Sequence, residues 1–113
     1  MEMSLGYMEE TVDAMGGKGY AVERLCAHYD DASTITGHTF VLTRESVELR
    51  METVVHPEEG ERYFLELVNY HGLWSHCFEL DSWKHRPDRI EFKYQPRADG
   101  SGGLAFTIKF DES

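Results

Sequence analysis

The chain has 113 residues and a formal net charge of −10, from 21 acidic and 11 basic residues, and 41% of it is hydrophobic. This length and apolar content suit a single domain, residues 1–113, with one core. The charge argues against nucleic acid or an anionic membrane as the principal ligand. No apolar stretch approaches the roughly 20 residues that a membrane-spanning helix needs, and the acidic start lacks the features of a signal peptide. We therefore expect a cytoplasmic protein.

The first predicted element is a short amphipathic helix near the N-terminus. Apolar residues recur at helical spacing from Leu5 to Met15, Ser4 can serve as the N-cap, and Gly16 and Gly17 end the pattern. The next segment, 20–29, fits either a helix or a strand. Its entry after a glycine-rich turn favours a strand.

From Gly37 onward the hydrophobic pattern changes to a period of two, which indicates strands. The clearest alternation covers 47–55, with one face apolar and the other charged. Short turn sequences separate the other alternating segments. Strands are expected at 39–44, 47–55, 62–70, 73–80, 90–94 and 104–110.

Successive strands with short connections predict an antiparallel meander. Segment 62–70 is apolar on both faces, so we expect it in the middle of the sheet with another element packed on its second side. The predicted fold class is α+β, with the N-terminal helix packed on the concave face of a curved, mainly antiparallel sheet of about six or seven strands. Segment 96–103 is interpreted as a long hairpin loop.

Residue types that could carry chemistry are present, but their spacing does not indicate a site. Cys26 and Cys77 lie far apart without a paired motif, so they are expected to be free, largely buried thiols. The six histidines show no zinc-ligand spacing, and we expect neither a metal nor another cofactor. Glu48 and Glu52 share a strand face with Arg50 between them, which is more typical of a solvated surface than of an acid/base pair. No catalytic residue is assigned, and the protein is not expected to be an enzyme.

The charge is distributed unevenly along the chain. Residues 1–83 contain 16 acids and 5 bases, whereas 84–97 contain 5 bases and 2 acids. This predicts an acidic body with one basic patch. The segment 83–89 is interpreted as an exposed connection, most simply one whose cations offset the acidic body, with a basic contact as the alternative. The residues of that contact would be Trp83, Lys84, Arg86 and Arg89.

The acidic surface is the feature that most suggests a function. Carboxylates on a small β-rich scaffold can stand in for phosphates and occupy a basic groove of a partner protein. The leading hypothesis is an inhibitor that mimics nucleic acid, for example a phage-encoded, anti-CRISPR-like inhibitor of a host defence complex; an immunity protein for a nuclease toxin would look the same. The expected partner-binding residues are Asp30, Asp31, Glu48, Glu52, Glu58, Glu59 and Glu61.

Two alternatives remain open. The sheet and the helix could enclose a pocket for a small ligand or a reaction, lined by Tyr63, Trp74, His76, Phe92 and Phe106. The protein could also form a homo-oligomer through an exposed strand edge or through the aromatic-rich second face of the sheet. Neither alternative involves direct contact with nucleic acid or a membrane.

Overall fold

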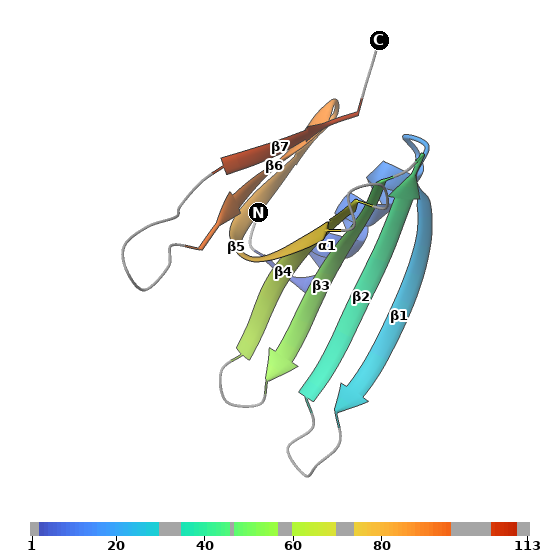
Figure 1. Cartoon of the computed structure of the whole chain (residues 1–113). Coiled ribbons are helices and arrows are strands. Elements are labelled where there is room, and N and C mark those ends of the chain that lie inside the picture. Colours follow the sequence, from blue (N-terminus) through green and yellow to red (C-terminus); the bar gives the residue numbers. More distant parts are fainter. Residues whose placement is uncertain are drawn as a thin grey trace.

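The computed structural model describes residues 3–29, 35–45, 47–56, 60–69, 74–95 and 105–110. These residues form one helix and a seven-stranded sheet in which the strands follow one another in chain order (Figure 1). Every neighbouring pair is antiparallel, and the sheet is not closed: β1 pairs only with β2 and β7 only with β6. The predicted α+β fold, a helix packed on a meander sheet, is confirmed.

The elements follow the predicted order. They are α1 (Leu5–Gly16), β1 (Ala21–Tyr29), β2 (Ile35–Arg44), β3 (Val47–His56), β4 (Gly60–Asn69), β5 (Trp74–Arg86), β6 (Arg89–Tyr94) and β7 (Ala105–Lys109). The ambiguous segment 20–29 is a strand, as favoured. In the described chain no helix is both long enough and apolar enough to span a membrane.

Helix α1 begins and ends where its capping residues predict. The Ser4 hydroxyl accepts a hydrogen bond of 3.0 Å from the Tyr7 backbone N–H, which satisfies one of the unpaired donors of the first turn. At the other end the Gly17 N–H donates to the Asp13 carbonyl at 3.1 Å. One side of the helix is buried against the sheet, through Tyr7, Met8, Thr11, Val12 and Met15.

Strand β5 is longer than predicted because it belongs to two parts of the sheet. Residues 74–79 pair with β4, and 80–86 pair with β6. The register shifts between Leu80 and Ser82, so the next core residue is Trp83 and not residue 82. This extra residue breaks the period of two, which is why the sequence pattern ended the strand at 80. In Figure 1, β6 and β7 stand apart from β1–β4 and are joined to them through β5.

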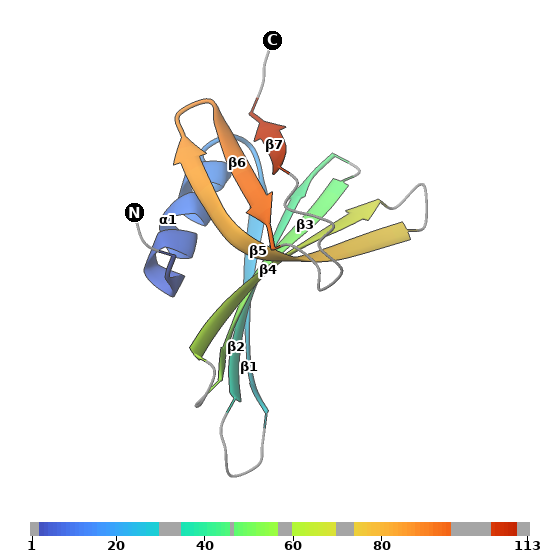
Figure 2. The ribbon, with the colours of Figure 1, turned by 90° about the vertical axis from the view of Figure 1, so that its left-hand side faces the viewer.

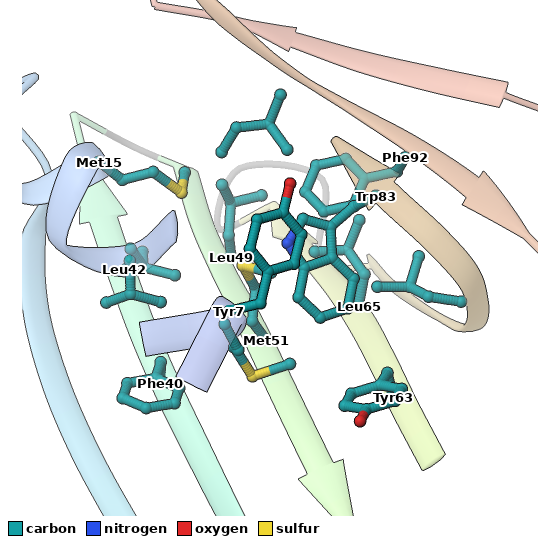
Figure 3. Packing of buried hydrophobic residues seen from close by; sticks show 14 of the residues in the cluster. Tyr7, Met15, Phe40, Leu42, Leu49, Met51, Tyr63, Leu65, Trp83 and Phe92 are labelled. Atoms are coloured by element: carbon teal, nitrogen blue, oxygen red, sulfur yellow. The ribbon is translucent and has the colours of Figure 1, made fainter. Parts of the chain in front are cut away.

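Trp83 lies at the centre of the core, where α1 meets β5 (Figure 3). Its ring stacks on Tyr7 with centroids 5.3 Å apart and meets the edge of Tyr63 at 5.5 Å. The indole N–H donates to the Thr11 hydroxyl at 3.0 Å, and that hydroxyl donates to the Tyr7 carbonyl at 2.9 Å. The Tyr7 hydroxyl accepts from the backbone N–H of His85 at 2.8 Å. Rings and hydrogen bonds together therefore fix the helix on the sheet.

Tyr63, in the same cluster, makes the stability of the fold decrease at high pH. Burial, followed by the charge of Glu61 and a hydrogen bond to it, raises the pKa of Tyr63 to about 12. Because the pKa is about 10 in an unfolded chain, this tyrosine contributes stability that is complete below pH 10 and is lost as pH rises toward 12. Because solvent screens part of this effect, we expect the free energy of unfolding to fall by no more than roughly 2 kcal/mol over this interval.

Urea denaturation between pH 9 and 12, for the wild type and Tyr63→Phe, measures this effect. Phenylalanine cannot ionise, so the variant should show a shallower decline with pH. Equal slopes for the two proteins would contradict the assignment to Tyr63.

Candidate functional site

The two faces of β1–β5 differ in what covers them. Helix α1 packs on one face, and in the described part of the chain no element packs on the other (Figure 2). We call the uncovered surface the open face. The strand register places on it Glu23, Leu25, Thr39, Val41, Glu48, Arg50, Glu52, Arg62, Phe64, Glu66, Cys77 and Glu79.

This arrangement corrects one expectation from the sequence. Segment 62–70 is central, as predicted, but its second side is not covered by another described element. Phe64 and Val68 are half-buried on the open face instead. Their burial comes from neighbours on adjacent strands, because Phe64 stands between Glu52 and Glu79 in the ladder.

The open face carries five carboxylates and two guanidinium groups, an excess of three negative charges. One cross-strand row runs from Glu23 through Arg50 to Glu66. The adjacent row includes Glu52 and ends at Glu79. Because five strands contribute, the charge is spread over a broad sheet surface and not confined to one loop.

Arg50 organises the centre of the open face. Its Nε lies 2.5 Å from Glu48 Oε2, and its Nη1 lies 3.9 Å from Glu66 Oε1. Glu48 is only 7% exposed, so its carboxylate holds Arg50 in place and is not available to a partner. Beside this group the Thr39 hydroxyl donates to Glu52 Oε2 at 3.0 Å. The side chains at the centre are thus held in position before any partner binds.

A second arginine is held at the edge of the same face. Arg62 donates through Nε and Nη2 to the two oxygens of Glu79, at 2.9 and 2.7 Å. These hydrogen bonds lower the pKa of Glu79, so this carboxyl group is ionised at neutral pH. The guanidinium group also lies 5.6 Å from the centroid of the Phe64 ring.

A hollow of about 170 Å³ lies between these groups, lined by Leu25, Thr39, Arg50, Glu52, Phe64, Glu66 and Cys77. Cys77 has an exposed free thiol, so it is not the buried thiol that the sequence predicted. Partial burial raises the pKa of this thiol, and the charges of Glu66 and Glu52 raise it further. Little thiolate exists at neutral pH, which argues against a nucleophilic role.

The thiol reactivity of Cys77 tests this electrostatic description. We expect iodoacetamide at pH 7.5 to alkylate Cys77 more slowly than a free cysteine peptide, because thiolate is the reacting form. Glu66→Gln should speed the reaction, since of the two carboxylates that raise the pKa of the thiol Glu66 has the larger effect, whereas Glu10→Gln on α1 should not. Mass spectrometry of the peptide that contains Cys77 gives the rate. Equal rates for wild type and Glu66→Gln would contradict the account.

The predicted partner-binding residues do not form one surface. Glu48 and Glu52 lie on the open face, whereas Glu61 is exposed on the opposite face beside Tyr63. The remaining predicted residues, Asp30, Asp31, Glu58 and Glu59, lie outside the described residues. The structure adds three acids that were not in the predicted set, Glu23, Glu66 and Glu79. Only the cross-strand register reveals that these three share a face with Glu52.

The predicted basic connection is instead a β-hairpin. Strand β5 ends at Arg86, Pro87 and Asp88 form the turn, and β6 begins at Arg89. Trp83 is 1% exposed, so it is not available for the basic contact in which the sequence placed it. Its indole is held in the core by Tyr7 and Thr11.

The cations of this hairpin share one side of it, which we call the basic face: Lys84, Arg86, Arg89 and Lys93. Two acidic residues lie beside these cations. Arg89 contacts Asp88 and Glu91, each at 2.8 Å, and Arg86 lies 3.7 Å from Glu91. The hydrogen bond from Arg89 lowers the pKa of Glu91. Much of the positive charge is therefore compensated within the hairpin.

Of the pocket residues expected from the sequence, Phe92 and Phe106 lie together, with ring centroids 6.0 Å apart, and pack in the core. Tyr63 and Phe92 are buried in the core, and Phe106 is half-buried on β7. The side chains of Trp74 and His76 lie outside the described residues. Within the described part of the chain, no three His, Cys, Asp or Glu side chains gather as metal ligands would.

The charged groups at the centre and edge of the open face are held by contacts within the sheet. No protein-family model, curated protein or solved structure matches the chain.

Proposed function

We propose that the protein is a non-enzymatic binding protein that docks its open face on a basic surface of a partner protein. The observation that carries the proposal is the set of four at least partly exposed carboxylates, Glu23, Glu52, Glu66 and Glu79, and two arginines spread over the sheet, with α1 packed on the other face. A net charge of −10 on the whole chain adds a long-range attraction to a positive surface. Such steering raises the association rate and selects against acidic partners.

The composition of the open face supports docking in a second way. Arginine and aromatic residues are enriched in protein interfaces, and here Arg62 lies against Phe64. Leu25, on the outer strand of the same face, is 49% exposed and offers apolar area to a partner. Because Arg50 and Arg62 are already held by glutamates, little side-chain ordering is needed on binding.

The partner surface that this face suits is one that binds nucleic acid. The carboxylates are spread over several strands of the sheet, and basic nucleic-acid sites attract such an array of negative charge. Docking there would block the nucleic acid, so the protein would act as an inhibitor. A phage-encoded inhibitor of a host defence complex and an immunity protein for a nuclease toxin both fit this role.

Capture from a lysate of cells in which the protein acts tests the proposal. The tagged protein is used as bait at low salt and again at about 0.5 M salt, where exposed charges are strongly screened. We expect a nucleic-acid-binding protein to be retained at low salt and released at high salt, and added nucleic acid to compete for it. A partner that resists high salt and is not displaced by nucleic acid would overturn the proposal.

A further inference from the structure

A second concave region lies where β3 and β4 approach β7. A hollow of about 210 Å³ is lined there by apolar and aromatic residues, chiefly Tyr20, Val47, Leu49, Leu67, Phe106 and Ile108. Leu49 is only 3% exposed, whereas Val47 is 44% exposed. The hollow therefore has a deep apolar floor and a rim that reaches solvent.

A polar hollow of about 250 Å³ adjoins it. The two share Tyr20 and Val47, and the second is also lined by Arg44, Glu45, Lys109 and Phe110. The shared residues place the two hollows next to each other.

Arg44 is fixed at this junction. Its Nη1 donates to the Phe110 carbonyl at 3.1 Å, and its guanidinium carbon lies 5.4 Å from the centroid of the Tyr20 ring. The guanidinium group has five N–H donors. After the hydrogen bond to Phe110, enough donors remain for a bidentate bond to a carboxylate. Lys18 adds charge nearby, with its Nζ 5.9 Å from the Phe110 ring centroid. Among the described residues, Arg44 and Lys109 line the polar hollow together with one acid, Glu45, and Lys18 lies nearby.

We propose that the two hollows form one binding site for a medium-chain carboxylate, with the alkyl chain in the apolar hollow and the carboxylate at Arg44 and Lys109. An apolar cavity of about 150 Å³ holds the six carbons of benzene, so about eight carbons suit the apolar hollow. A neutral alcohol would fill the same space without pairing with Arg44. A cationic amphiphile would be repelled by it. This site does not depend on the docking function of the open face.

Titration with octanoate below its micelle concentration, followed by methyl NMR of the full chain, tests the proposal. We expect saturable shifts at Val47, Leu49, Leu67 and Ile108, and roughly fivefold weaker binding of 1-octanol because it lacks the charge-assisted hydrogen bonds. Lys109→Gln, at an exposed position, should weaken octanoate and leave octanol unchanged. Lys84→Gln, on the basic face, is the matched control and should change neither.

Three results would overturn the inference. They are the absence of saturable shifts in the wild type, equal affinity for octanoate and octanol, and unchanged octanoate binding by Lys109→Gln. A variant that fills the apolar hollow, Ile108→Trp, should abolish binding of both ligands. If that variant does not fold, the comparison of octanoate with octanol on the wild type still tests the proposed site.

Discussion

Replacing Trp83 with alanine is expected to lower the free energy of unfolding by about 3–5 kcal/mol, a large part of the whole stability of a domain of this size. The indole is buried between the Tyr7 ring and the edge of Tyr63, and it links α1 to β5. Its removal leaves a cavity and takes away the Thr11 hydrogen bond. Chemical denaturation followed by far-UV circular dichroism measures the loss, because the readout does not depend on tryptophan fluorescence.

Two further variants separate packing from hydrogen bonding at Trp83. Trp83→Phe keeps an aromatic ring and loses the N–H, so it should cost less than alanine. Thr11→Val keeps the shape of the side chain and leaves the indole N–H without its acceptor, for an expected cost of about 1–3 kcal/mol. A loss below about 1 kcal/mol for Trp83→Ala would contradict the central place of this residue, since core Trp to Ala changes cost several times more.

Reversing charge on the open face is expected to weaken partner binding by about 100-fold, or close to 3 kcal/mol. The variant Glu23→Lys with Glu66→Lys replaces two acids of the central row by cations. It places positive charge against a positive partner surface and deprives Arg50 of one contact. Most of the change should appear in the association rate at low salt, measured by surface plasmon resonance against the captured partner.

The matched control makes the same change in net charge at a different place on the protein. Glu10→Lys with Asp13→Lys alters two exposed acids on α1, away from the open face, and gives an identical net charge. We expect this control to bind within about threefold of the wild type, because distant exposed charges are screened by salt. Equal weakening by both double variants would show that only the net charge matters and would remove the open face from the account.

The sequence was sufficient to predict most elements of this fold. Ser4 and the glycine pair at 16–17 gave the limits of α1, and the alternation in 47–55 gave β3 almost to the residue. Strand β5 was predicted only to residue 80, because one extra residue near Asp81 shifts the alternation and moves Trp83 into the core. Irregularities of this kind depend on how distant strands pack, which a local pattern does not contain.

The candidate site was harder to predict than the fold. The period of two predicted that Glu48 and Glu52 share a face. It did not predict that Glu48 is buried beside Arg50. The place of Glu66 and Glu79 on the same face depends on the register between strands, which the turns set. Trp83 resembled a surface residue because cations follow it in the sequence, yet the core packing against Tyr7 determines its position.

Carboxyl footprinting of the complex is the most direct test of docking by the open face. A carbodiimide with glycine ethyl ester labels exposed carboxylates, and mass spectrometry compares the free protein with the partner-bound protein. The account predicts protection of Glu23, Glu52 and Glu66 on binding, with unchanged labelling of Glu10 and Asp13 on α1. Protection confined to α1, with the open face labelled as in the free protein, would contradict it.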